Sequence, residues 1–116
     1  MKYLLLMYAN ETVASSFTPE QFQTANQEWM ALTKELQDAG VLLGNSGLSP
    51  VANATSVRVR DSKTLVTDGP FAETHEQLGG YFLVECSDLD EAISWAAKFP
   101  NAKYGTVEVR PLWSGR

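Results

Sequence analysis

The sequence predicts an α+β domain of the ferredoxin-like type, with an antiparallel sheet and two helices on one of its faces. Three observations lead to this fold class. The patterns along the chain run strand, helix, strand, hairpin, strand, helix, strand. Two segments carry apolar residues at steps of three and four, as amphipathic helices do. The length of 116 residues suits one domain, residues 1–116, with one hydrophobic core.

The first strand is expected at residues 2–9, which are apolar on both faces, as in a central strand covered on both sides. The polar residues 10–17 then predict a loop. A helix begins with Thr18 as N-cap and Pro19 in its first turn, and Gln21 closes a capping box.

The first helix carries one apolar stripe along its length, which predicts that it packs on the sheet. Gly40 is the expected left-handed stop. The second strand begins at residues 41–43 and runs into the glycine-rich residues 44–50, which predicts a loose or bulged exit. The stripe consists of Phe22, Ala25, Trp29, Leu32, Leu36 and Ala39.

A hairpin follows, because residues 56–60 alternate strictly between valine and polar or charged side chains. Residues 61–63 form the turn and residues 64–67 the returning strand, so the tip of the hairpin is expected to face water.

The C-terminal half repeats the pattern of strand, helix and strand. Residues 80–86 are apolar on both faces apart from Glu85, which is expected to pair across the sheet with an arginine or to line a polar pocket. Either Ser87 or Asp88 caps the second helix, and Pro100 ends it. The last strand covers residues 105–113. The inward side chains of the second helix are expected to be Leu89, Ala92, Ile93 and Ala96.

The two-faced strands also predict a partner. Two helices cover only one face of the sheet, yet residues 3–8 and 81–84 are apolar on both faces. Monomers rarely expose a large apolar patch. We therefore expect a homodimer, in which a second copy covers the free sheet face through a two-fold interface.

Composition excludes several classes of protein. Nine basic residues stand against fourteen acidic ones, for a net charge of −5, and no basic run exists, which argues against a nucleic-acid surface. No segment approaches the roughly 18 apolar residues of a membrane span, and the short apolar N-terminus resembles a strand more than a signal peptide. Cys86 is the only cysteine, so an intrachain disulfide is excluded, and its apolar context predicts a small buried side chain. We expect a cytoplasmic protein.

The candidate site is residues 67–75, which follow an apolar strand and contain the only histidine. One interpretation is structural: Asp68-Gly69 favours a tight turn and Pro70 stiffens it. The other is chemical. The unperturbed pKa of His75 lies near neutrality, and a nearby carboxylate would orient it as a general acid or base. The candidates are Asp68, Glu73 and His75 for catalysis and Gly69, Pro70 and Phe71 for ligand binding.

One histidine among scattered carboxylates matches no named metal-ligand spacing, so no metal and no other cofactor is expected.

Asp68-Gly69-Pro70-Phe71, followed by Glu73-Thr74 and Gly79-Gly80-Tyr81, resembles the DGPF-domain branch of the YCII-related family. Residues 3–8, 39–42 and 109–112 extend the resemblance over nearly the whole chain. The resemblance implies a bacterial protein of mostly unassigned function, with a ferredoxin-like domain that dimerises through its sheet into an assembly like a dimeric α+β barrel.

The wider YCII group has a proposed acid/base pair that this chain lacks. That pair is a His near the start of the first helix and an Asp just before a Pro at the end of the second. Here no His lies between Thr18 and Gly40, and Phe99 precedes Pro100. Any chemistry would then have moved to the stretch from Asp68 to His75.

The expected function is a homodimer that binds a small molecule, and acid/base catalysis on a small polar organic compound is left open. The alternative is a non-catalytic interaction or regulatory module linked to sigma-factor-dependent transcription, because some family members are linked to genes for extracytoplasmic-function sigma factors. Fold analogy alone adds a heme-free oxygenase-like or isomerase-like barrel.

Overall fold

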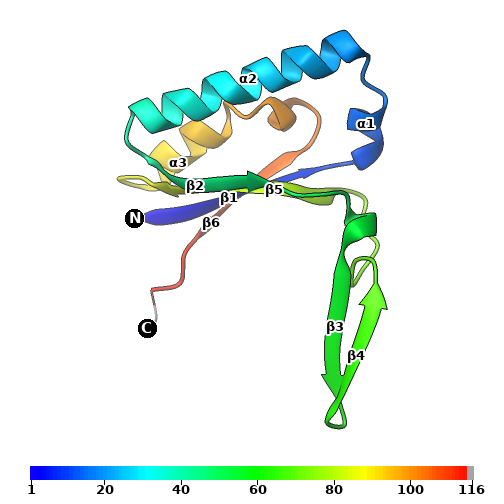
Figure 1. Ribbon diagram of the computed structural model, residues 1–116. Coiled ribbons are helices and arrows are strands. Elements are labelled where there is room, and N and C mark those ends of the chain that lie inside the picture. The colour runs from blue at the N-terminus through cyan, green and yellow to red at the C-terminus, as the bar shows by residue number, and fades with distance from the viewer. Residues whose placement is uncertain (115–116) are drawn as a thin grey trace.

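The computed structural model describes residues 1–114, which form a four-stranded antiparallel sheet with helices on one face (Figure 1). The strand order is β2-β5-β1-β6. The predicted α+β class is confirmed, and the main elements follow the order of a split βαβ unit. The sheet strands are β1 (Lys2–Ala9), β2 (Leu42–Gly47), β5 (Gln77–Glu85) and β6 (Thr106–Pro111); the two longer helices are α2 (Pro19–Asp38) and α3 (Leu89–Ala96).

Strand β1 lies at the centre of the core, as its apolar pattern predicted. It pairs with β5 on one side and β6 on the other, so that Leu5 stands between Phe82 and Val109. The core side chains lie on the helix side of the sheet, and Cys86, 3% exposed, is among them, which confirms that it is a small buried side chain. The core consists of Tyr3, Leu5, Met7, Leu32, Leu36, Val41, Phe82, Val84, Cys86, Ala92 and Phe99.

The first long helix begins and ends where the sequence predicted. The Gln21 backbone N–H donates to Thr18 Oγ1 at 3.1 Å, and the Thr18 N–H donates to Gln21 Oε1 at 2.9 Å, which completes the capping box. Gly40 adopts a φ of 73° after the last turn. Only the middle of the predicted stripe is buried. Phe22 and Ala39, at its two ends, are exposed.

Residues 10–17 are not the loop that their polarity predicted. Helix α1 (Glu11–Ser15) forms there, because Asn10 Oδ1 accepts a hydrogen bond from the Thr12 N–H at 3.0 Å and caps the first turn. The polar composition concealed this helix, since a five-residue helix shows no apolar period.

The second long helix is shorter than predicted. It ends at Ala96, and Pro100 begins the 3₁₀ helix η2 (Pro100–Lys103), where a proline suits the first turn. Leu89 and Ile93 are about half exposed, not inward as expected, because the face of α3 that packs on the core carries Ala92, Trp95 and Ala96.

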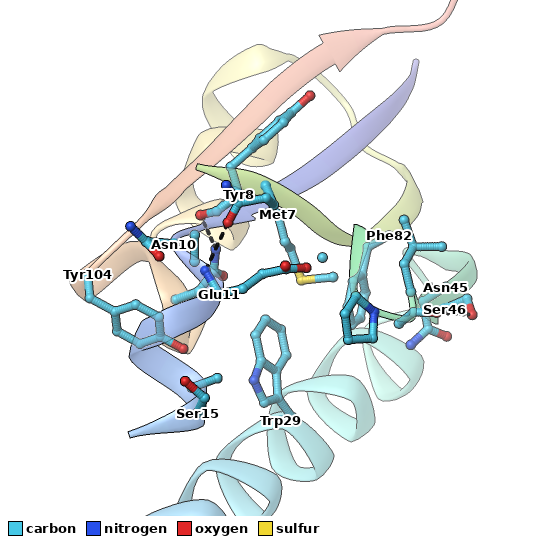
Figure 2. A pocket seen from close by; sticks show the side chains of 18 of the residues that line it. Met7, Tyr8, Asn10, Glu11, Ser15, Trp29, Asn45, Ser46, Phe82 and Tyr104 are labelled. Atoms are coloured by element: carbon cyan, nitrogen blue, oxygen red, sulfur yellow. Dashed lines mark hydrogen bonds between the residues drawn. The ribbon is translucent and has the colours of Figure 1, made fainter. Parts of the chain in front are cut away.

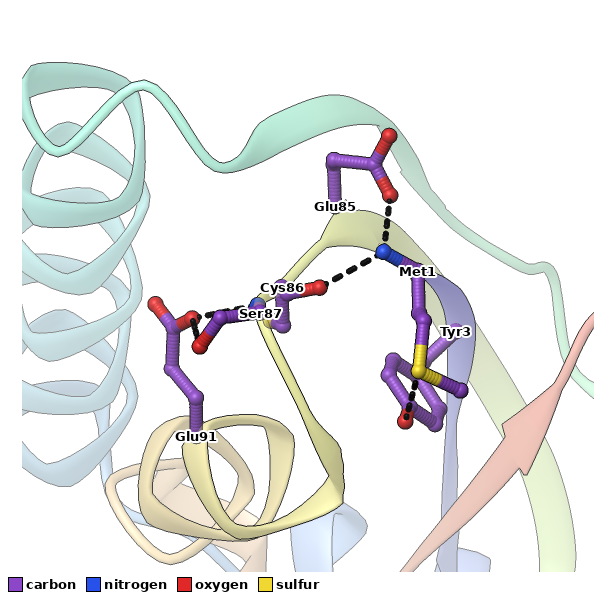
Figure 3. Close-up of polar contacts among 6 residues, drawn as sticks. All are labelled: Met1, Tyr3, Glu85, Cys86, Ser87 and Glu91. Carbon is purple, nitrogen blue, oxygen red and sulfur yellow. Dashed lines mark hydrogen bonds and ion pairs between the residues drawn. The ribbon is translucent and has the colours of Figure 1, made fainter.

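Polar contacts at the start of the chain tie β1 to the end of β5 (Figure 3). The Met1 amino group donates to the Cys86 carbonyl at 2.7 Å and pairs with the Glu85 carboxylate at 2.8 Å. The sequence had suggested that Glu85 pairs with an arginine or lines a polar pocket. In the structure it pairs with the Met1 amine. Figure 3 also shows the Glu91 carboxylate bound to Ser87 at the N-terminus of α3.

The predicted hairpin is confirmed and stands apart from the main sheet. Strands β3 (Thr55–Arg60) and β4 (Lys63–Asp68) form a two-stranded sheet of their own, here called the arm (residues 55–68). Figure 1 shows the arm extending away from the main sheet on the side opposite the helices. Its apolar face is uncovered, with Val57, Val59 and Val66 between 59% and 64% exposed.

The sheet face away from the helices carries Leu4, Leu6, Tyr81 and Leu83, because these residues alternate with the core residues along β1 and β5. We call these four side chains the open face. No helix within residues 1–114 covers it. None of the helices in that range is long and apolar enough to cross a membrane.

Candidate functional site

A pocket of about 650 Å³ lies between the end of β1, helix α1 and helix α2 (Figure 2). This volume is in the range that small organic ligands occupy, roughly 300–1,000 Å³. We call it the Trp29 pocket. Its apolar walls include Met7, Trp29, Leu48, Pro50 and Phe82, and its polar groups include Asn10, Glu11, Asn45, Gln77, Asn101 and Tyr104.

The aromatic wall of the pocket is part of the core. The Trp29 ring stacks on Phe82 with ring centroids 6.0 Å apart. Both rings also make T-shaped contacts with Phe99, with centroid distances of 5.4 Å from Trp29 and 4.9 Å from Phe82. Since Phe99 and Phe82 are buried, the wall is held in place by packing rather than by a mobile loop.

Glu11 is the first residue of α1 and contacts two other segments of the chain. Its backbone N–H donates to Gln77 Oε1 at 2.9 Å, and its carboxylate Oε2 accepts the Val51 N–H at 3.0 Å. Val51 begins the 3₁₀ helix η1 (Val51–Asn53). Gln77 Nε2 in turn donates to the Thr74 carbonyl at 2.7 Å. The Val51 N–H orients the Glu11 carboxylate, while Gln77 fixes the Glu11 backbone.

Asn101 is 5% exposed and lines the pocket from η2. Its Nδ2 donates to the carbonyls of Tyr8 and Thr106 at 3.3 and 3.4 Å, and its Oδ1 accepts no hydrogen bond from residues 1–114. The two carbonyls can only accept hydrogen bonds, so the NH₂ group of the Asn101 side chain must face them. A flipped side-chain amide would place Oδ1 against the two carbonyl oxygens. A buried acceptor without a donor costs about 1–3 kcal/mol, and Asn101 therefore carries such a cost in the isolated chain.

Tyr104 lines the same pocket from the end of η2 and packs edge-on against Phe17, with ring centroids 6.2 Å apart. Burial raises the pKa of the Tyr104 phenol, and the nearby Glu28 carboxylate raises it further. The phenol is therefore neutral at physiological pH.

The residues that the sequence singled out lie at the foot of the arm. Asp68 is the last residue of β4 and pairs with Thr55. Gly69 adopts a φ of 94°, its N–H donates to the Ala54 carbonyl at 2.7 Å, and its own carbonyl accepts the Ser56 hydroxyl at 2.8 Å. The positive φ expected of Gly69 is present and the chain bends there, but the pairing with residues 54–56 continues to Gly69 in place of a tight turn.

The remaining predicted residues are spread over the surface of this segment. Gly69 is partly buried, while Pro70, Glu73 and His75 are exposed and Phe71 is 78% exposed. None of the six predicted residues lines the Trp29 pocket. Within the described chain, no hydrogen bond or ion pair joins His75 to Asp68 or Glu73, so one copy does not assemble them into an acid/base pair.

Sequence reasoning missed Glu11, Gln77 and Asn101. A weak signal was present: Asn10-Glu11 directly follows the first apolar strand, and Asn101 directly follows Phe99-Pro100. Polar residues at such junctions border the core, although nothing local indicates that they meet. In the part of the chain that the structure describes, no three His, Cys, Asp or Glu side chains lie close enough to hold a metal ion.

Fold and site together define an α+β domain with a ligand-sized, largely apolar pocket beside its central strand. The profile of the YCII-related domain matches residues 1–115, and the chain belongs to the YCII-related family. An uncharacterized protein of Rhizobium meliloti (strain 1021) is 39% identical over 114 residues, which cover 97% of this chain and 92% of that protein. The family part of the resemblance is thus confirmed.

Proposed function

We propose that this protein is a homodimeric small-molecule-binding domain whose ligand occupies the Trp29 pocket. The observation that carries the proposal is the pocket itself, a space of about 650 Å³ with apolar walls that is also lined by the polar side chains of Glu11, Gln77 and Asn101. A concave apolar site with a few convergent polar groups is the usual architecture of a ligand site.

Two apolar surfaces that no helix of residues 1–114 covers support the homodimer, although Leu6 on the first of them is already buried within one copy. The open face lies on the central strands, and the apolar face of the arm stands beyond it on the same side of the sheet (Figure 1). A two-stranded hairpin alone in water is at best marginally stable. A second copy related by a two-fold axis would cover both surfaces at once and form a barrel-like assembly.

The stretch from Asp68 to His75 is a proposed second part of the site. Gln77 supports this, because it lines the pocket, holds Glu11 and donates to the carbonyl of Thr74. In the dimer, Asp68, Glu73 and His75 would act as acid and base on a small polar organic compound, beside Gly69, Pro70 and Phe71. The same stretch supports membership of the DGPF-domain branch, and the single buried cysteine is in keeping with a cytoplasmic protein.

The alternative is a non-catalytic interaction or regulatory module, linked to sigma-factor-dependent transcription. The exposed apolar residues of the arm, together with Phe71, favour it. An interaction module would bind a partner protein through the arm and would leave the Trp29 pocket without a ligand.

The test is a thermal-shift screen of the wild-type protein against a metabolite library, because a ligand of the native state raises the unfolding temperature. Amide chemical shifts then locate each hit. We expect shifts at residues 45–48, 77–79 and 101–104. If no compound stabilises the protein, or if every hit perturbs only the arm, the pocket proposal is wrong. Sedimentation at micromolar concentration tests the homodimer, and a clean monomer would refute it.

A further inference from the structure

The charge that lines the Trp29 pocket is negative. Of the lining residues, all within the described chain, Glu11 carries the only charge, and no lysine, arginine or histidine is among them. An anionic ligand would bring a like charge next to Glu11 where apolar walls reduce the screening by water. A cationic or neutral ligand meets no such penalty.

The polar groups left over in the pocket are acceptors. Glu11 Oε2 is used by the Val51 N–H, while Glu11 Oε1 has no hydrogen-bond partner among residues 1–114. Asn101 Oδ1 likewise has none. Figure 2 shows the Glu11 side chain reaching into the space beside Met7 and Trp29. Asn101 Oδ1 is enclosed by the protein, so Glu11 Oε1 is the acceptor that a ligand would meet, and a ligand that satisfies it, directly or through one water molecule, must bring an N–H or O–H donor.

The walls add a second preference. The aromatic side chains of Trp29 and Tyr104 line the pocket, and aromatic faces attract cations placed over them. The apolar side chains of Met7 and Phe82 suit a hydrocarbon or aromatic body. The Glu11 carboxylate, the aromatic side chains and the lack of a basic residue among the lining residues together favour one class of ligand.

We propose that the Trp29 pocket takes an organic amine, a protonated nitrogen on an apolar or aromatic body, and that Glu11 is the residue that holds the nitrogen. The inference rests on the proposed function of the pocket and adds the class of its ligand. Because the Val51 N–H already binds the Glu11 carboxylate and Gln77 binds the Glu11 backbone before the ligand arrives, less ordering of the side chain remains to oppose binding.

The experiment compares three probes of similar size: 2-phenylethylamine, 3-phenylpropan-1-ol and 3-phenylpropanoate. Binding to the wild-type protein is followed by amide chemical shifts at residues 45–48 and 77–79. We expect the amine to bind at least about tenfold more tightly than the alcohol, with the carboxylate weakest. Equal binding of alcohol and amine would overturn the amine inference and leave the pocket function intact. If none of the three probes binds, both fall.

The variant Glu11→Gln removes the charge but keeps an oxygen for the Val51 N–H, so the fold is expected to persist. Its preference for amine over alcohol should fall at least about fivefold. The matched control Glu20→Gln removes the same charge from an exposed position in the first turn of α2 and should leave the preference unchanged. An unchanged preference in Glu11→Gln would refute the role of Glu11. Should that variant not fold, the ranking of the three probes on wild type decides the inference.

Discussion

The indole of Trp29 lies nearly parallel to the ring of Phe82, with centroids 6.0 Å apart and an interplanar angle of 23°. This pair joins the first long helix to the sheet and forms the wall between the core and the pocket. A side chain on α2 therefore serves stability and the site at once.

Replacing Trp29 by alanine is expected to destabilise the protein by about 2–4 kcal/mol, because contacts with Phe82 and Phe99 are lost and a cavity opens. Trp29→Phe keeps an aromatic face and should cost less than half as much. Urea unfolding followed by far-UV circular dichroism measures both. Equal stability of the alanine variant and the wild type would mean that the aromatic cluster is not part of the core.

Gly105 lies so close to β1 that a methyl group there would collide with the Tyr8 carbonyl oxygen and with Ala9. Gly105→Ala is therefore expected to cost about 1–3 kcal/mol, because backbone must move to admit it. The control is Gly44→Ala, where a Cβ would meet nothing within 4 Å, and a change within about 0.5 kcal/mol is expected. If urea unfolding gives the same midpoint for both variants, the close approach of residue 105 to β1 is wrong.

The N-terminus of α3 should respond to pH. The Ser87 N–H and hydroxyl donate to Glu91 Oε1 at 2.7 and 3.0 Å (Figure 3), and these bonds lower the pKa of the Glu91 carboxyl. A carboxyl whose pKa is lower in the folded state stabilises the protein above its unfolded pKa, and this stabilisation is lost as pH falls through the folded pKa.

We therefore expect Glu91→Gln to be less stable than the wild type at pH 7 and to differ little from it once the pH lies below the folded pKa of Glu91. Unfolding by urea at a series of pH values measures the difference. Asp90→Asn, at an exposed neighbouring position, is the control. A gap between Glu91→Gln and the wild type that does not narrow with falling pH would contradict the expectation.

Cys86 is expected to resist alkylation in the native protein. Its side chain is 3% exposed, and burial, with a smaller contribution from the Glu91 carboxylate, raises the pKa of the thiol. The thiolate, which is the reactive form, is scarce at neutral pH. Mass spectrometry after iodoacetamide treatment should detect labelling only when urea unfolds the chain. Labelling of the folded protein at the rate of free cysteine would show that the thiol is accessible.

Features whose causes lie within a few residues of each other could be predicted from the sequence. The capping box from Thr18 to Gln21 and the stop at Gly40 bound α2, because caps are local hydrogen bonds and backbone conformations. The alternation of valine with polar or charged side chains in residues 56–60 predicted the hairpin. The pattern of residues 2–9 predicted a central strand, since both faces of β1 carry apolar side chains.

Only the tertiary structure decided the pocket. Glu11, Trp29 and Asn101 stand up to ninety positions apart in the chain, and they meet because the end of β1, helix α2 and helix η2 converge on one end of the sheet. It also separated His75 and the foot of the arm from that pocket, although the sequence had made them the most conspicuous chemical groups. Proximity between distant side chains follows from how the sheet and helices pack, and no local pattern of residues encodes that packing.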